Sequence, residues 1–246
     1  TRGQREFRED LNLRRNEVAP ASLLFFYLFL VIGAYLMGQA VGDSLFLSVF
    51  PEHLPNAMIG SAVMIGVLVA IYIRLSTRLR METLIVSTLL FFSLSFACFW
   101  WLTQSRLRWA YLLVYMWVYA AGAMGPMMGW TLANYVLTTR EARRLFGFIG
   151  AGAILGGTFF SFVTSDLLHH EHLRPQSFLL AIAVLLAVCA LLVKLLFRTS
   201  RQRLVGVSEG PAAGHGSPEG FGQSLKLIGE SRYLRLLAGL TAIGCL

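Results

Sequence analysis

An aspartate inside an otherwise apolar stretch is the first residue of this chain whose type and place suggest chemistry. Asp43 is the one charged side chain between Ala21 and Phe50. A carboxylate in a membrane-spanning helix costs about 2.5–3.5 kcal/mol, so it usually faces a bundle interior or a cavity. A position roughly 33 Å along a helix from Ala21 would instead place it at a membrane boundary. Both interpretations stay open, and Gln39 is a second candidate for a substrate path.

Polar and aromatic residues also mark the end of the fourth apolar stretch. Trp130 and Asn134 are candidates for substrate contact, and Asn134 equally for a hydrogen bond between helices. Thr138 and Glu141 then match a capping box, in which Thr caps the helix and Glu, three residues on, reaches back. The pattern predicts a helix that begins beside Thr138.

Charged residues in two predicted loops are candidates for a gate on one side of a transporter. Such residues would lock that side shut and release it as two halves of the protein rock. The candidates are Arg78, Arg80, Glu141, Arg143 and Arg144. For the last three, a helix cap together with membrane topology is a sufficient alternative explanation.

Other patterns that bind metals or nucleotides are incomplete. Three histidines and a glutamate lie in the segment 169–172, without a recognisable ligand spacing. Gly150 and Gly152 are not followed by the third glycine of a dinucleotide-binding loop, because residue 155 is leucine. No nucleophile, base and orienting group converge at one membrane depth. We therefore predict that the protein is not an enzyme and holds no metal or cofactor.

The composition indicates which elements position these residues. Of the 246 residues, 56% are hydrophobic and only 14% are charged, which excludes an ordinary soluble domain. Six stretches are long enough to cross a bilayer as helices. These predicted spans are 21–50, 56–73, 83–103, 109–137, 145–165 and 176–197. The sequence therefore predicts an all-α polytopic membrane protein.

The predicted organisation has four parts. Residues 1–19 form a charged cytoplasmic segment, and Pro20 stands where a helix can begin. Residues 20–198 form a six-helix bundle. Residues 199–231 form a cytoplasmic linker, rich in Gly, Pro and Ser, with an amphipathic segment. Residues 232–246 begin a seventh membrane helix.

The net charge of +8 describes membrane topology. Of the 21 Lys and Arg residues, all but Arg106, Arg108 and Arg174 lie before the first span, in alternate loops on the same side, or at the helix ends that adjoin these loops. This is the positive-inside pattern, and it predicts a cytoplasmic N-terminus. A nucleic-acid partner is not needed to explain the charge. The excess of Arg over Lys indicates a GC-rich bacterial genome, and hence an inner-membrane location.

Small residues and one proline predict how the helices pack. Gly152, Gly156 and the adjacent Gly157 have the spacing that lets membrane helices approach closely. Pro126 removes a backbone hydrogen bond within the fourth span and predicts a kink. Close contact on one helix face is also predicted for Gly33, Gly38 and Gly42.

The order of residues around the fourth and fifth spans resembles the ATP/ADP translocase family of nucleotide transporters, which is of the major facilitator type. The matching residues are Trp130, Ala133, Asn134, Thr138, Glu141, Ala142, Arg143 and Arg144. Weaker matches are Asp43-Ser44-Leu45, similar to a Lys-Asp-Thr-Leu of the family, and Glu230-Ser231 with Tyr233-Leu234. Gly42 and Gln39 stand where the family often has basic residues.

This resemblance implies the N-terminal half of a twelve-helix antiporter that moves ATP and ADP by alternating access. Its partners would be the lipid bilayer, a nucleotide or another organic anion, and a second six-helix half. No Lys or Arg is predicted at mid-membrane, although a nucleotide needs cationic or helix N-terminal contacts. A membrane scaffold or regulatory module that binds a partner protein, without transport, is the alternative function.

Overall fold

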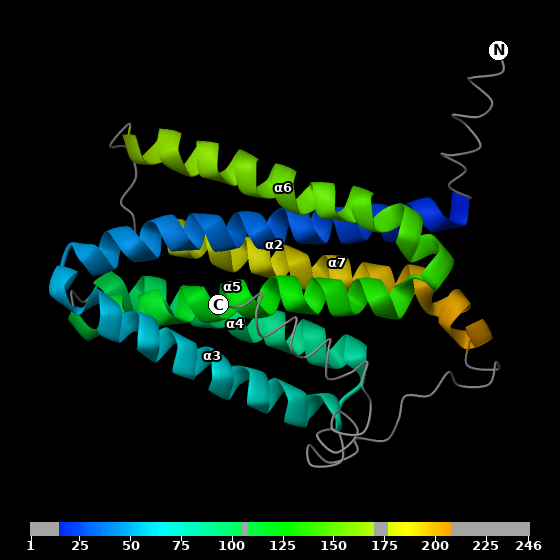
Figure 1. Ribbon diagram of the computed structural model, residues 1–246, viewed down its shortest axis with the longest axis horizontal. Helices are drawn as coiled ribbons and strands as arrows, with labels where there is room; N and C mark the ends of the chain where they lie inside the picture. Colours follow the sequence, from blue (N-terminus) through cyan, green and yellow to red (C-terminus); the bar gives the residue numbers. More distant parts are fainter. Residues whose placement is uncertain (1–14, 105–107, 170–176, 208–246) are drawn as a thin grey trace, which may run out of the picture. The chain divides into compact units, whose positions relative to one another are not determined.

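The computed structural model describes residues 15–104, 108–169 and 177–207, and all regular structure within these ranges is helical. The elements, labelled in Figure 1, are α2 (Arg15–Leu47), the 3₁₀ turn η1 (Pro51–His53), α3 (Leu54–Ser76), α4 (Met81–Gln104), α5 (Arg108–Val136), α6 (Thr139–His169) and α7 (Ser177–Val207). Six of these helices are long and apolar enough to cross a membrane. The predicted class, an all-α polytopic membrane protein, is confirmed.

Several helices extend beyond the predicted apolar spans. Helix α2 begins at Arg15 and contains Pro20, which we had expected at its start. Proline removes one backbone donor there, and a helix near its first turns tolerates that loss. Helix α6 spans 31 residues because it begins before its apolar part. Helix α7 likewise continues past residue 197, into the segment predicted as a linker.

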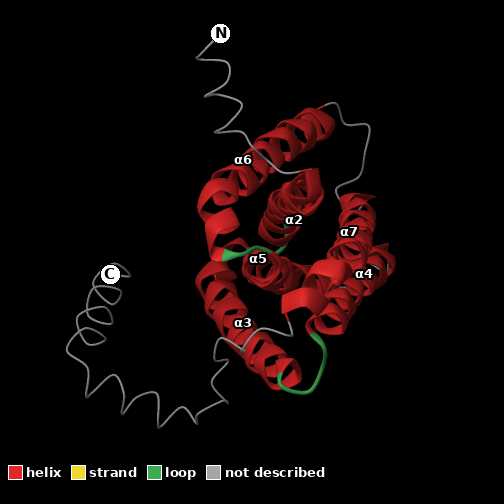
Figure 2. Ribbon diagram, turned by 90° about the vertical axis from the view of Figure 1, so that its right-hand side faces the viewer, coloured by secondary structure: helices red, strands yellow, loops and turns green. Residues whose placement is uncertain are grey.

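Five arginines of the described loops and helix termini lie at one end of the bundle, whereas Arg108, at the start of α5, lies at the other. Arg74 ends α3, Arg78 and Arg80 lie in the turn to α4, and Arg143 and Arg144 lie on the first turns of α6. We call this the basic end; it lies to the right in Figure 1 and faces the viewer in Figure 2. Helix α2 begins there and ends at the opposite end. Which end is cytoplasmic stays a prediction.

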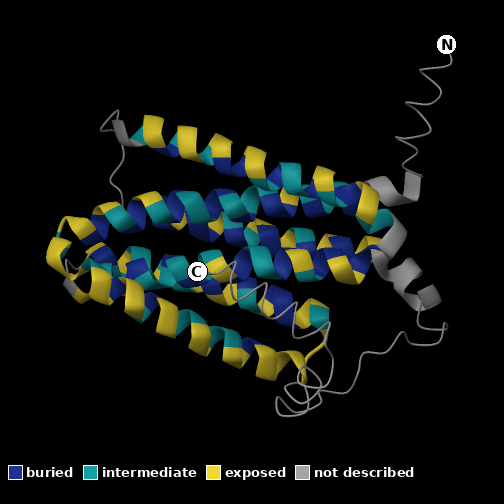
Figure 3. Ribbon diagram, in the orientation of Figure 1, coloured by how far each residue is buried: buried dark blue, intermediate teal, exposed yellow. Residues whose placement is uncertain are grey.

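Helices α2 and α5 are the best covered of the six. In each of these two helices, half of the most apolar 18-residue stretch is buried inside the structure, compared with 11% in α3 and 22% in α6. Helix α2 packs against α6 on one side and α5 on another, as the end-on view in Figure 2 shows. The exposed residues run along the outer faces of α3 and α6 in Figure 3. The structure thus places α2 at its centre.

Glycines bring α6 into backbone contact with α2. A Cβ atom on Gly152 would lie 2.6 Å from the carbonyl oxygen of Phe25, and one on Gly156 would lie 2.6 Å from the Cα atom of Phe29. A Cβ atom on Gly157 would lie 3.0 Å from a methyl carbon of Leu36. Since no side chain fits at the first two positions, α6 lies against the backbone of α2 there.

The glycines of α2 contact two neighbouring helices rather than one. Gly33 faces the ring of Phe160 on α6, whereas Gly38 and Gly42 both face Val118 on α5. Our prediction of a single glycine face was therefore wrong. Five residues separate Gly33 from Gly38, which turns the helix by roughly 140° beyond one full turn. Helix α2 is in close contact with α6 on one side and with α5 on another, and it has glycines on both of these sides.

A buried hydrogen bond joins α2 to α5 beside the proline. The Tyr27 hydroxyl donates to the backbone carbonyl of Gly125 at 3.0 Å, within the buried interior. Helix α5 runs from Arg108 to Val136 as one element through Pro126. A polar side chain from a neighbouring helix is one way in which membrane proteins stabilise the backbone around a proline. Pro126 thus lies at the α2–α5 contact, inside a continuous helix.

The capping box at the start of α6 is present as predicted. The backbone N–H of Thr138 donates to Oε2 of Glu141 at 2.9 Å, and the N–H of Glu141 donates to Oγ1 of Thr138 at 3.4 Å. Each side chain thereby satisfies a backbone donor that a helix N-terminus leaves unpaired. The two residues fix the point at which the chain turns from α5 into α6.

Replacement of Thr138 by alanine should lower the stability of the bundle by about 0.5–2 kcal/mol, because an N-cap is lost. The readout is the thermal unfolding midpoint of the full-length protein in detergent. Thr158→Ala on the same helix is the control, since its hydroxyl bonds only to the carbonyl of Ile154 within the helix. Equal midpoints for the two variants would show that the cap does not stabilise α6.

Candidate functional site

Three side chains of α2 form a polar line toward the end opposite the basic end. Tyr35, Gln39 and Asp43 are spaced four residues apart, so they share one face of the helix. Tyr119 of α5 meets this line. We call these four residues the polar stripe. All four are partly buried, so the stripe lies at the edge of the packed interior.

Tyr119 connects the two sequence-predicted residues of the stripe. Its hydroxyl donates to Oδ1 of Asp43 at 3.2 Å and accepts from Nε2 of Gln39 at 3.4 Å. A hydroxyl can donate and accept at once, which makes a continuous chain from the amide to the carboxylate. The structure therefore brings Gln39 and Asp43 into one hydrogen-bonded group, through a residue that the sequence reasoning did not select.

An aromatic cluster holds Tyr119 in place. The ring of Tyr119 lies 4.8 Å from that of Tyr115, and Tyr115 lies 4.7 Å from Phe46 of α2, measured between centroids. Phe46 and Tyr115 form a buried group with Ala57 of α3. Because such packing fixes ring orientation, the hydroxyl of Tyr119 is aimed by contacts from three helices.

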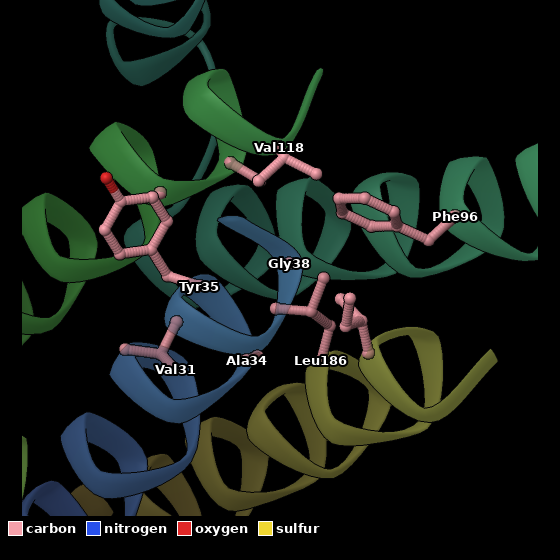
Figure 4. Close-up of a pocket in the computed structure, with 10 residues that line it drawn as sticks. Val31, Ala34, Tyr35, Gly38, Phe96, Val118 and Leu186 are labelled. Atoms are coloured by element: carbon pink, nitrogen blue, oxygen red, sulfur yellow. The ribbon is translucent and has the colours of Figure 1, made fainter. Parts of the chain in front are cut away.

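A glycine on α5 makes room for the other tyrosine of the stripe. The ring of Tyr35 lies directly against Gly122, where a Cβ atom would overlap the ring carbons. Tyr35 and Gly122 also line a small internal cavity, together with residues of α4 and α7 (Figure 4). Any side chain larger than hydrogen at position 122 would therefore displace Tyr35 from the stripe.

The chemistry of the stripe is that of hydrogen bonding around one carboxyl group. Its members supply two phenols, one amide and one acid, and none is a cation. Asp43 lies one turn before α2 ends at Leu47. The stripe can orient hydroxyl or amide groups and can hold a proton. It offers no positive charge to a phosphate group.

The other two predicted path residues lie near the basic end. Trp130 and Asn134 are both exposed on α5, roughly 17 Å and 23 Å along the helix from Tyr119. The Trp130 ring meets that of Phe146 on α6 edge-on, with centroids 5.6 Å apart. Gly150 lies beside the same ring, since a Cβ atom there would be 3.9 Å from it. The four predicted residues thus form two separate groups.

The gate candidates come from two elements at the basic end. Arg78 and Arg80 are exposed in the turn between α3 and α4. Arg78 and Arg74 line a hollow of about 340 Å³. Arg143 and Arg144 are exposed on α6. Both elements face the viewer in Figure 2. Glu141 takes part in the helix cap, and a gating role for all five candidates stays a prediction.

A small cavity lies between α2, α4, α5 and α7. The cavity in Figure 4 has a volume of about 10 Å³, which is about the room that one water molecule needs. A larger open groove of about 580 Å³ runs between α2 and α6. Its polar lining residues are Thr158, Ser161 and Ser165.

Tyrosines are the members of the candidate site that the sequence did not single out. Tyr111, Tyr115 and Tyr119 recur every four residues along α5, and Tyr35 stands four residues before Gln39. A tyrosine ladder in an apolar span puts several hydroxyl groups on one helix face. That spacing was the signal available, although tyrosine is also common in ordinary aromatic packing.

The histidine-containing segment 169–172 gives no further site. Residues 170–172 lie outside the described part of the chain, and so does the side chain of His169. Among the residues that the structure does describe, no group of three or more His, Cys, Asp or Glu is close enough to hold a metal.

Comparison with known proteins gives one match. A family model described as the TLC ATP/ADP transporter matches residues 93–244, which is more than half of the chain. The matched region includes Trp130, Asn134 and the capping box, but it begins after α2 and therefore excludes Asp43 and Gln39. No curated protein and no solved structure matches the chain.

Proposed function

Since the chain belongs to the TLC ATP/ADP transporter family, we propose that it is one half of a major-facilitator-type antiporter that exchanges nucleotides by alternating access. The family match carries this proposal. The six apolar helices support it, because they form a half-bundle of the size that such transporters pair across a central path. A second six-helix half, or a second copy, completes the path.

The polar stripe forms one wall of that path in this proposal. Its members are partly buried, and they run along the two best covered helices, α2 and α5. A polar line at this depth needs either protein or a water-filled cavity beside it. The cations that the phosphates require come from the other half or from the arginines of the basic end.

The same proposal gives the basic end a role. With the N-terminus in the cytoplasm of a bacterial cell, Arg78, Arg80, Arg143 and Arg144 lie at the cytoplasmic entrance. There they attract anionic nucleotides and close the entrance when the halves rock. Trp130 and Asn134 lie near this entrance, where an exposed indole can stack on a nucleobase.

Exchange in liposomes tests the proposal. The full-length protein is reconstituted into vesicles loaded with unlabelled ADP, and labelled ATP is added outside. We expect saturable uptake that stops when the internal ADP is omitted, because an exchanger returns only with substrate bound. Vesicles without protein give the background. Arg143→Ala/Arg144→Ala should raise KM more than it lowers kcat, since these residues act at the entrance.

Absence of saturable flux for ATP, ADP and other organic anions would contradict the proposal. A stable partner protein that co-purifies with a flux-negative membrane domain would then favour the scaffold function. Both outcomes are read on the same preparation, because the vesicles are made from the purified sample in which a partner would be detected.

A further inference from the structure

One face of α3 is open in the described part of the chain. Only 11% of its most apolar 18-residue stretch is buried, and a Cβ atom on Gly66 would meet no heavy atom of the described residues within 4 Å. Val63, Val67 and Ile71 are exposed and stand four residues apart, so they share one side of the helix. We call these three residues the apolar line; the exposed surface of α3 is visible in Figure 3. In a membrane, such a line contacts acyl chains.

Two arginines follow the apolar line where the membrane span ends. Arg74 stands three residues after Ile71, which places both on the same face of α3, and Arg78 lies in the turn that follows. Both are exposed, and together with Leu75 and Thr77 they line the hollow of about 340 Å³ at the basic end. That volume lies in the range of small-molecule sites, about 300–1,000 Å³. The surface of α3 therefore changes from apolar to cationic at the membrane boundary.

The end of α3 is capped without the help of either guanidinium group. The hydroxyl of Thr77 donates to the backbone carbonyl of Arg74 at 2.8 Å. The backbone N–H groups of Arg78 and Leu79 donate to the carbonyl of Leu75 at 3.0 Å and 2.9 Å. These bonds satisfy carbonyl groups that a helix C-terminus leaves unpaired. The arginine side chains are therefore not needed for the helix end and can serve another acceptor.

The positive charge of the hollow is not neutralised by a carboxylate. Among the described residues, neither Arg74 nor Arg78 forms an ion pair. The nearest acidic residue along the chain is Glu82, in the first turn of α4, where a negative charge is favourable to the helix N-terminus. A guanidinium group presents its N–H donors in a fork that fits the oxygens of a phosphate group. The hollow therefore offers two such forks beside an apolar surface.

We propose that Arg74 and Arg78 bind the phosphate group of an anionic phospholipid, whose acyl chains lie along the apolar line. Basic pockets at the membrane boundary suit anionic lipid headgroups. A nucleotide has the same phosphate chemistry but no acyl chain for the apolar line, so the lipid is the better occupant. Arg80, Arg143 and Arg144 then remain for the nucleotide entrance. The site goes beyond the proposed exchange and does not depend on it.

Native mass spectrometry of the full-length protein tests the site. Delipidated protein in detergent is titrated with dioleoyl phosphatidylglycerol or with dioleoyl phosphatidylcholine, which has the same acyl chains and no net charge. We expect phosphatidylglycerol to be retained at lower concentration. Arg74→Ala/Arg78→Ala should weaken its binding by roughly tenfold or more, because the charges that attract the phosphate are lost. Lys194→Ala/Arg198→Ala is the control: it removes two exposed charges one turn apart on α7, outside the hollow, and should leave binding unchanged.

Several results would overturn the lipid site. Equal retention of the two lipids by the unmodified protein is one, and it needs no variant. Equal loss of binding in the two double variants is another, because net charge alone would then explain it. Glycerol 3-phosphate and ATP carry phosphate without acyl chains, and displacement of the lipid by either would assign the hollow to a free phosphate group. Absence of any retained phosphatidylglycerol, as expected if a second six-helix half covers α3, would also contradict the site.

Discussion

Replacement of Gly156 by valine is expected to abolish the folded bundle. At this position a Cβ atom would lie 2.6 Å from the Cα atom of Phe29, so the obstacle is the backbone of α2 and not a movable side chain. Overpacking usually costs about 1–3 kcal/mol, and a backbone contact cannot relax by a change of rotamer. The two helices must separate, and α2 then loses its most extensive contact with another helix.

Gly147→Val on the same helix is the matched control. A Cβ atom there would meet no heavy atom of the described residues within 4 Å, so the substitution adds a side chain without a clash. Both variants of the full-length protein are fused to a fluorescent reporter and compared by size-exclusion chromatography in detergent. We expect a monodisperse peak for Gly147→Val and aggregate for Gly156→Val. A monodisperse peak for both would show that α2 and α6 are not in backbone contact.

Replacement of Tyr119 by phenylalanine should slow nucleotide exchange roughly tenfold, if the polar stripe lines the path. The variant keeps the ring that packs on Tyr115 but loses the hydroxyl that joins Gln39 to Asp43. Loss of one partner from a buried hydrogen-bonded group costs about 1–3 kcal/mol, and 1.4 kcal/mol is a factor of ten. The measurement is the initial rate of labelled ATP uptake into ADP-loaded vesicles.

Tyr111→Phe is the control for this substitution. It removes the same hydroxyl from the same helix two turns away, outside the polar stripe. Its exchange rate should equal that of the unmodified protein, and both variants should elute as monodisperse species. Equal rates for Tyr119→Phe and Tyr111→Phe would place the substrate path away from the stripe.

Features that depend on near neighbours in the chain were predictable. The capping box of Thr138 and Glu141 needs only four consecutive residues, and the structure contains both of its hydrogen bonds. The six spans follow from apolar runs, because the bilayer sets their length. The spacing of Gly152 and Gly156 likewise predicted a close helix contact.

Features that depend on distant segments were not predictable in the same way. The glycine spacing of α6 does not say which helix it meets, and the partner proved to be α2, more than 100 residues earlier. Gly33 and Gly38 could not be assigned to different neighbours before those neighbours were placed. Tyr119 gained its importance only because its hydroxyl reaches Asp43 from another helix.

The contact between α2 and α6 also constrains the order in which the protein is made. The first of the described membrane helices meets the fifth, so the pair cannot form until the chain has been synthesised and inserted as far as α6. Until then, the side of α2 that will face the glycines of α6 must be covered by lipid or by an insertion factor, because α6 has not yet been made. Contacts of long sequence separation form late. Assembly at the ribosome therefore passes through a stage in which α2 has been inserted and α6 has not.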